Sequence, residues 1–337
     1  MIDISAEPAL RQYLVDNKHV SSAGDCTITY CGGGVSGTVA FVTADGRDMI
    51  VKQALAKLKV KEEWLCDPNR MHIEMKSNEI YHRLAPEYTP AVYFYDHENF
   101  IFGREAAPTQ CVMWKQNLMD GLLNFVVSEK VIRAMLIVHN ECARDKQVAK
   151  VFADKGIFYE LRISPYIEFT VSKYPHLAEF AKPIIKELME SAITLVHGDY
   201  SPKNIMVDGQ KIYVMDFEVA HYGHPSFDLA FLSNHLVLKS VHNRPFGTAY
   251  LAMLRSMLNI YFGEMDYMDK DKLETSFIEL LALLMHARID GKSPVEYLVG
   301  IEDKKELVRQ MAFAIIDRGI TTYDAMLKIV RKYVEEV

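Results

Sequence analysis

The sequence predicts an α+β fold with two lobes: a small, β-rich amino-terminal lobe over residues 1–106 and a larger, mostly helical lobe over residues 107–337. The length of 337 residues corresponds to about two domains, and half of the residues are hydrophobic, which is enough to bury a large core. Short segments rich in β-branched and aromatic residues, separated by turn residues, concentrate near the amino terminus. Longer segments of helical periodicity fill most of the remaining chain.

The amino-terminal lobe is expected to combine five strands with one helix. The Asp45-Gly46 pair is a hairpin signal between the second and third strands. Helical spacing of apolar and small residues predicts a helix over residues 67–84, and Pro86 ends that segment. The expected strands cover residues 26–31, 38–43, 49–53, 91–96 and 99–106.

The larger lobe is expected to be helical apart from one strand pair. The apolar runs 205–207 and 212–215 predict two short strands, which the turn DGQK joins into a hairpin. This hairpin would bring together the polar residues on either side of it. Long helices are expected at about 226–240, 246–262, 273–287 and 303–334.

A glycine-rich segment lies between the first two strands. The sequence GGGVSG matches G-x-G-x-x-G through Gly32, Gly34 and Gly37, which is a weak signal alone because glycine-rich turns are common. A dinucleotide-binding loop would open into a helix, whereas a strand follows here. This context favours the kinase hairpin that covers the ATP phosphates, with Lys52 on the next strand. A plain glycine-rich hairpin with a surface lysine is the alternative for this segment alone.

Four polar residues flank the predicted hairpin of the larger lobe. Asp199 precedes Asn204 by five positions, the spacing of a kinase catalytic loop, in which the aspartate orients the attacking hydroxyl and the asparagine reaches a metal. If Asp216 and Glu218 lie on extended backbone, both carboxylates point the same way and Phe217 turns into the core. Each acid could alone be a turn or cap residue. Together with the glycine loop and the strand lysine they indicate phosphoryl transfer.

The segments HGDYSPKN and VMDFEVAHYGHPSFDLAFLSNHL resemble the aminoglycoside phosphotransferase and choline kinase superfamily. The form Asp-x-Glu and the sequence HYGHPSFDLAF are most similar to its methylthioribose kinase-like branch, and FYELRISPYI and ARIDGKSPVEYL also resemble an uncharacterised bacterial subgroup. The resemblance implies a bilobal, protein-kinase-like fold. It implies that Asp199 is the catalytic base, that Lys52 meets the α- and β-phosphates, and that Mg²⁺ is bound by Asn204, Asp216 and Glu218.

The resemblance also implies a glutamate partner for Lys52 on the first helix of that lobe after the strands. Glu74 and Glu79 both qualify, but five positions correspond to roughly 140° around a helix, so only one can face the site, and we choose Glu74. The hinge near GREAAP is expected to meet the adenine through backbone groups of Glu105 and Ala107.

The acceptor is expected to contact the helical lobe. Tyr159 and Arg162 fall with Tyr166 on one helical face before a possible break at Pro165. Arg288 lies near a helix end, and the resemblance implies that an arginine meets the substrate or the transferred phosphate, which makes Arg288 a candidate. An amphipathic surface is the alternative for these residues. Protein kinases have a lysine two positions after the catalytic aspartate, where this chain has Ser201, and a lysine occurs only at Lys203. The γ-phosphate clamp therefore stays unassigned.

Composition restricts the partners. The net charge of −7 and the lack of a lysine or arginine stripe argue against nucleic acid, and no apolar run approaches the length of a membrane span. We expect a cytoplasmic monomer or homodimer that uses ATP, with GTP left open, and Mg²⁺. Its partner would be a small hydroxyl acceptor: a sugar, an amino alcohol or an aminoglycoside-like compound. The alternatives are a non-catalytic nucleotide-binding pseudokinase and, with less support, a protein kinase, since no activation segment ending in Ala-Pro-Glu is present.

Overall fold

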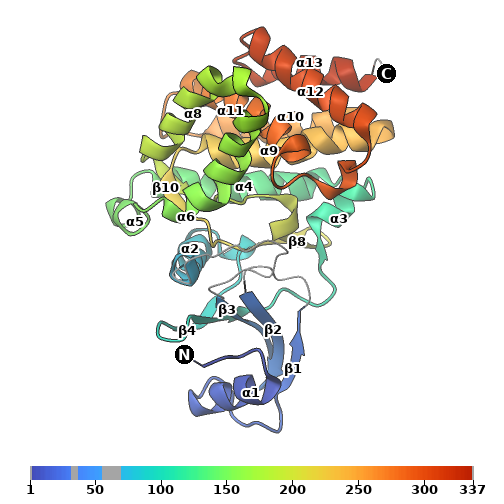
Figure 1. Ribbon diagram of the computed structural model, residues 1–337. Coiled ribbons are helices and arrows are strands. Elements are labelled where there is room, and N and C mark those ends of the chain that lie inside the picture. Colours follow the sequence, from blue (N-terminus) through green and yellow to red (C-terminus); the bar gives the residue numbers. More distant parts are fainter. Residues whose placement is uncertain (1, 32–36, 55–69, 336–337) are drawn as a thin grey trace. The chain divides into compact units, whose positions relative to one another are not determined.

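The computed structural model describes residues 2–31, 37–54 and 70–335 of the chain. The chain forms two compact units (Figure 1). The amino-terminal unit comprises Met1–Cys111 and Tyr213–Glu218, and the carboxy-terminal unit comprises Val112–Ile212 and Val219–Val337. The predicted boundary at residue 106 assigns residues 213–218, with Asp216 and Glu218, to the larger lobe, whereas these residues belong to the amino-terminal unit.

An antiparallel sheet of five strands forms the centre of the amino-terminal unit, in the order β1-β2-β3-β5-β4. The predicted Asp45-Gly46 turn joins β2 to β3, and both residues have positive φ (53° and 72°), as in a type I′ hairpin. The strands are β1 (Thr27–Tyr30), β2 (Gly37–Ala44), β3 (Arg47–Ala54), β4 (Val92–Asp96) and β5 (Ile101–Glu105). The helical segments of this unit are α1 (Glu7–Asp16), α2 (Arg70–Leu84) and η1 (Pro86–Tyr88).

The side chains of β3 point alternately to the two faces of the sheet, and each face packs against a different helix. Val51 packs with Leu14 of α1 in one hydrophobic cluster. Ala54 packs with Met75 of α2 in a second cluster. Because neighbouring residues of a strand point to opposite faces, Lys52 shares the face of Ala54 and points toward α2.

The carboxy-terminal unit is built around α9, which is buried along almost its whole length and contacts α10, α11 and α12 (Figure 1). A helix that is buried on all sides belongs to the centre of a helical core. The helices are α3 (Trp114–Met119), α4 (Phe125–Cys142), α5 (Lys146–Val151), α6 (Gly156–Phe158), α7 (Phe169–Lys173), α8 (Ala178–Glu190), α9 (Ser226–His242), α10 (Gly247–Glu264), α11 (Lys270–Asp290), α12 (Glu302–Asp317) and α13 (Tyr323–Glu335).

Short helical segments and strands complete the fold. The 3-10 segments are η3 (Pro175–Leu177), η4 (Pro202–Asn204), η5 (Arg244–Phe246) and η6 (Glu296–Leu298), and η2 (Tyr159–Glu168) is a π-helix. One small sheet pairs β7 (Thr194–Val196) with β10 (His221–Gly223), and another has the order β6 (Val112–Met113), β8 (Ile205–Asp208) and β9 (Lys211–Val214). In the described part of the chain, no helix is both long enough and apolar enough to cross a membrane.

The prediction of one helix over residues 303–334 is wrong, because the chain breaks between α12 and α13. Gly319 has φ 58°, in the left-handed region that glycine adopts readily. Its N–H donates to the carbonyl of Ile316 (3.0 Å), and the N–H of Ile320 donates to that of Ile315 (3.1 Å). This is a Schellman motif, which terminates a helix.

The possible break at Pro165 is also absent. The chain continues through Pro165 inside η2, and proline lacks the N–H that an α-helix would need at that position. A π-helix has wider turns than an α-helix and is frequent at functional sites. Arg162 and Tyr166, both buried, lie on this segment.

Candidate active site

Lys52 of β3 pairs with a glutamate of α2. Its Nζ atom lies 2.7 Å from Glu74 Oε2 and 2.9 Å from Asp216 Oδ1, and both Lys52 and Glu74 are buried. Glu79, on the same helix, is exposed. Glu74 is therefore the helical glutamate that Lys52 contacts. Burial opposes the charged form of Lys52, but the carboxylates of Asp216 and Glu74 outweigh burial and raise its pKa.

Three carboxylates gather around Lys52. Glu74, Asp216 and Glu218 each offer an oxygen atom, and these atoms lie within 4.8 Å of one another. Arg70 holds Glu218, with 3.3 Å between Nε and Oε2. Burial raises the pKa of Glu74 to about 7; Lys52 opposes this rise, and the charges of Asp216 and Glu218 add to it. Carboxylate oxygens are the hard ligands that Mg²⁺ takes, so this donor set fits that ion.

The backbone at Asp216 is not extended, although the predicted common direction of the Asp216 and Glu218 carboxylates assumes an extended backbone. Asp216 has φ 68°, in the left-handed region, and residues 215–217 are not part of a strand. Phe217 is nevertheless fully buried, with its ring centre 4.6 Å from that of Tyr81, and both carboxylates reach the cluster. A left-handed aspartate costs about 1 kcal/mol, and such strain concentrates at functional sites.

Asp199 is the centre of a polar cluster in the carboxy-terminal unit, where it is only 4% exposed. Arg162 Nη2 lies 3.1 Å from Asp199 Oδ1, and Lys203 Nζ lies 2.9 Å from Oδ2. The side-chain amide of Asn204 donates to the same Oδ2 (2.9 Å) and to the backbone carbonyl of Asp199 (3.0 Å). The five-residue spacing thus brings Asp199 and Asn204 into contact.

Asp228, in the first turn of α9, holds the backbone that precedes Asp199. Its carboxylate accepts the backbone N–H groups of His197 (2.7 Å) and Gly198 (2.9 Å), and it lies 3.3 Å from His139 Nε2. Burial would raise the pKa of Asp228, but the contacts with His139 and His197 lower it on balance. Gly198 has φ 74°, and a Cβ atom there would lie 2.6 Å from a backbone carbonyl oxygen. The position of Asp199 therefore depends on Gly198 and Asp228.

Two of the three predicted acceptor residues share one aromatic neighbour. The guanidinium carbons of Arg162 and Arg288 lie 5.7 and 5.4 Å from the ring centre of Tyr166, and Arg288 Nη1 lies 3.1 Å from the Tyr166 hydroxyl. Tyr159 does not join them: it is 39% exposed, and its hydroxyl donates to Glu168 (3.0 Å). Arg162, Tyr166 and Arg288 form one group next to Asp199, and Tyr159 lies outside it.

The predicted nucleotide-contacting residues lie in or directly after the sheet, as far as the structure describes them. Gly37 opens β2, where a Cβ atom would clash with the carbonyl oxygen of Gln53, so glycine is required. Glu105 ends β5, and Ala107 follows in an irregular segment. Gly32 and Gly34, and residues 67–69 of the predicted helix, lie outside the described residues. Contacts of these positions with a nucleotide stay predictions.

Three charged residues that the structure places in these clusters have no assigned role in the site that the sequence predicts. Arg70 lies at the first turn of α2, before the helical spacing becomes recognisable. Asp228 opens the Asp-Leu-Ala sequence of α9, so an acid at a helix start was the available signal. Lys203 is visible only as a lysine displaced from the kinase position, and the structure places its ammonium group on Asp199.

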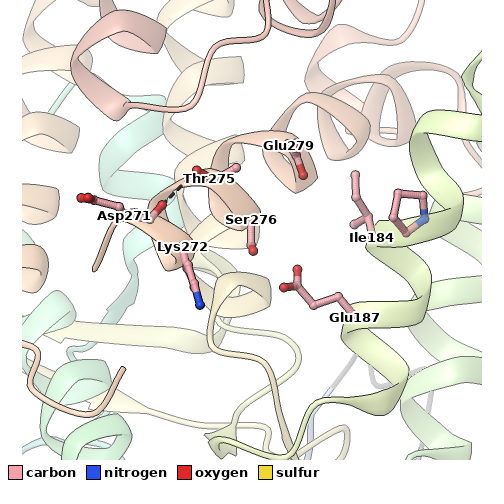
Figure 2. A pocket seen from close by; sticks show the side chains of 8 residues that line it. Ile184, Glu187, Asp271, Lys272, Thr275, Ser276 and Glu279 are labelled. Carbon is pink, nitrogen blue, oxygen red and sulfur yellow. Dashed lines mark hydrogen bonds between the residues drawn. The ribbon is translucent and has the colours of Figure 1, made fainter. Parts of the chain in front are cut away.

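A surface pocket of about 480 Å³ lies between α8 and α11 (Figure 2). Its charged lining consists of Glu187, Asp271, Lys272 and Glu279. It contains none of the predicted site residues and none of the residues that hold Asp199. We therefore do not place the chemistry in this pocket.

Known proteins are similar to this chain in sequence and in fold. Residues 166–264 match the family "phosphotransferase enzyme family" (APH). Methylthioribose kinase 1 of Oryza sativa subsp. japonica is 26% identical over 263 residues, which cover 68% of this chain and 59% of that protein. Methylthioribose kinase of Geobacillus sp. (strain WCH70) is 22% identical over 316 residues, which cover 80% of this chain and 78% of that protein. The chain thus spans about three fifths of the rice protein.

Solved structures agree on the fold. Choline kinase from Cryptosporidium parvum Iowa II has a TM-score of 0.57 at 12% identity, and the match covers 96% of this chain and all of that one (100%). Ethanolamine kinase from Plasmodium vivax has a TM-score of 0.51 at 13% identity, with 98% and 92% covered. At this identity the likeness shows the fold alone, and it confirms the predicted protein-kinase-like α+β class. The predicted resemblance is confirmed as well: residues 166–264 match the phosphotransferase enzyme family, and methylthioribose kinases are among the proteins similar to this chain in sequence.

Proposed function

We propose that the protein transfers the γ-phosphate of ATP to a hydroxyl group of a small molecule. The observation that carries this proposal is the buried Lys52 with the carboxylates of Glu74, Asp216 and Glu218 around it. Phosphoryl transfer needs little covalent chemistry from the protein and depends on positioning and on charge neutralisation, which a fixed lysine and metal-binding carboxylates supply. The similarity to methylthioribose kinases supports the same class of reaction.

In this proposal Lys52 contacts the α- and β-phosphates, and Glu74 keeps its ammonium group in place. Asp216, Glu218 and Asn204 would hold Mg²⁺; Asn204 would use Oδ1, because its amide nitrogen donates to Asp199. Bound Mg²⁺ supplies neutralisation of the phosphate oxygens. Further nucleotide contacts are proposed at Gly32, Gly34, Gly37, Glu105 and Ala107.

Asp199 acts as the base in this proposal. Its carboxylate accepts a hydrogen bond from the acceptor hydroxyl and takes the proton as the new O–P bond forms and the bond between the γ-phosphorus and the ADP leaving group breaks. Arg162 and Lys203 fix the position of this carboxylate, because each places a positively charged nitrogen within 3.1 Å of one of its oxygen atoms. Lys203 is also half exposed and is our candidate for the γ-phosphate clamp, the role for which the sequence pattern supplies no residue.

The test is Mg·ATP-dependent ADP release with a panel of sugars, amino alcohols, aminoglycosides and hydroxy acids, with products identified by mass. We expect one chemical class to accelerate ADP release and to gain one phosphoryl group. Nucleotide binding without acceptor-dependent turnover would instead support the non-catalytic alternative. Phosphorylation of peptides in place of small molecules would support the protein kinase alternative.

A further inference from the structure

One face of α9 carries two buried basic side chains, each with a nitrogen atom that has no hydrogen-bond partner within the described part of the chain. Phe231, His235 and Lys239 follow each other at intervals of four, so they share one face of the helix. His235 is 8% exposed and Lys239 only 1%. The buried His235 Nε2 and Lys239 Nζ atoms have no hydrogen-bond partner among the described residues.

Two further polar groups complete a cluster with these side chains. Lys239 Nζ lies 4.8 Å from the ring centre of Tyr297, whose buried hydroxyl has no hydrogen-bond partner among residues 2–31, 37–54 and 70–335. The buried Nε atom of Arg288 is also without a partner there, although its Nη1 contacts Tyr166. We call His235, Lys239, Arg288 and Tyr297 the α9 basic cluster.

The α9 basic cluster has no neutralising acid in the described structure. Neither Lys239 nor Arg288 forms an ion pair with any described carboxylate, and Glu296 pairs with Lys115. Burial lowers the pKa of Lys239 to about 7, and Lys115 and Arg288 add to this effect while Glu296 opposes it. Burial would raise the pKa of Tyr166, but Arg288 and Arg162 outweigh burial and lower it. These directions agree with a positive potential around the cluster.

The cluster continues to the proposed base. The ring of His235 lies 5.5 Å from that of Phe231, and the Arg162 guanidinium carbon lies 5.7 Å from the same Phe231 ring. Arg162 in turn contacts Asp199. Phe231 and His235 are about 6 Å apart along the helix axis, and only the side chains of Arg162 and Phe231 link Asp199 to His235 in this series of contacts.

We propose that the acceptor carries an anionic group, a carboxylate or a phosphate, that the α9 basic cluster binds while a hydroxyl of the same molecule faces Asp199. This inference rests on the proposed function and narrows its acceptor to an acid. Burying a cation without hydrogen-bond acceptors destabilises a protein. A bound anion would supply those acceptors, which explains why the cluster contains unpaired cations in the described structure. The same positive charge would repel cationic acceptors such as aminoglycosides and amino alcohols.

The test measures binding to the full chain by calorimetry without nucleotide, using matched pairs of probes. Gluconate is compared with glucitol for a carboxylate, ribose 5-phosphate with ribose for a phosphate, and choline serves as the cation. We expect at least one anion to bind ten-fold or more tightly than its neutral partner, and the two pairs distinguish carboxylate from phosphate. Choline should not bind more tightly than the neutral compounds.

Lys239→Met tests the site itself. We expect it to weaken binding of the preferred anion at least ten-fold, to leave the neutral partner unchanged and to raise the unfolding temperature, because an unpartnered buried cation is removed. The matched control is Lys186→Met, which removes the same charge from a side chain that is 70% exposed. Should Lys239→Met fail to fold, Tyr297→Phe removes one unpartnered hydroxyl and should weaken the same anion.

Two results would overturn the inference. One is the absence of any anion preference in either pair with the wild-type protein. The other is unchanged anion affinity in folded Lys239→Met, which would make Lys239 a neutral core residue. If the first result is accompanied by phosphorylation of a neutral or cationic acceptor, the inference fails and the kinase proposal stays intact. Anion binding that depends on Lys239 without phosphorylation of any bound compound would contradict the kinase proposal and leave the anion site intact.

Discussion

The contact between Lys52 and Glu74 predicts a measurable coupling between two substitutions. Lys52→Met removes the cation that lies 2.7 Å from Glu74 and 2.9 Å from Asp216. It leaves the buried Glu74 carboxylate beside two further carboxylates. Glu74→Gln removes one of those carboxylates, while Lys52 keeps its contact with Asp216. The first change should therefore destabilise the protein much more than the second.

The magnitudes follow from burial. Removing one partner of a buried ion pair costs about 3–5 kcal/mol, so we expect a loss of that order for Lys52→Met. Glu74→Gln should cost about 1 kcal/mol or less, because Lys52 keeps its contact with Asp216 and burial disfavours the ionised form of Glu74. The double variant leaves no unpaired charge at these two positions. It should be more stable than the sum of the single effects predicts, by about 2 kcal/mol.

The assay is equilibrium unfolding in urea at neutral pH, with nucleotide affinity measured on the same samples. Glu79→Gln is the matched control, because it makes the same chemical change on the exposed side of α2. We expect that control to behave as the wild type in both measurements. Additive losses in the double variant, or an effect of Glu79→Gln as large as that of Glu74→Gln, would refute the reasoning.

The remaining predictions concern metal, backbone and pH. Asp216→Asn and Glu218→Gln should each raise the Mg²⁺ concentration needed for half-maximal turnover, because an amide is a weaker ligand than a carboxylate. If Glu218→Gln needs no more Mg²⁺ than the wild type while Asp216→Asn does, Glu218 is not a metal ligand. Gly198→Ala should lower the unfolding temperature and abolish turnover, because it places a Cβ atom against a carbonyl at positive φ; retained turnover would contradict this. Burial raises the pKa of Asp290, but hydrogen bonds from Arg309, Tyr174 and Lys305 outweigh burial and lower it, so the ionised carboxylate stabilises the protein above the usual carboxyl range and this stabilisation is lost as the pH falls through that range. In urea unfolding, Asp290→Asn should therefore lose about 2 kcal/mol of stability at neutral pH and less in acid.

Local sequence patterns predict which helices and strands are present better than they predict where those elements end. The Asp45-Gly46 hairpin and the helix α2 follow from turn chemistry and from helical spacing, both of which are properties of neighbouring residues. The break at Gly319 depends on one left-handed residue inside an otherwise helical pattern. The continuation through Pro165 depends on a change of helix type that periodicity does not report.

Long-range contacts account for what the sequence left open in the site. The choice of Glu74 over Glu79 was accessible, because helix rotation allows only one of them to face Lys52. The contact of Arg162 with Asp199 joins residues far apart in the chain, and the sequence predicts only a contact between Arg162 and the acceptor. The left-handed backbone of Asp216 could not be predicted from the residues around it, and the Asp216 and Glu218 carboxylates lie close together without the extended backbone that the prediction assumed.

The most direct test of the central claim compares turnover with nucleotide binding in Asp199→Asn. The measurement is phosphate transfer from γ-labelled ATP to the accepted small molecule, with ATP affinity determined in parallel and Asp317→Asn as an exposed control. We predict a loss of turnover of about 10²- to 10⁴-fold with ATP affinity unchanged, because the base contacts the acceptor hydroxyl and not the nucleotide. Turnover at the wild-type rate in Asp199→Asn would contradict the account.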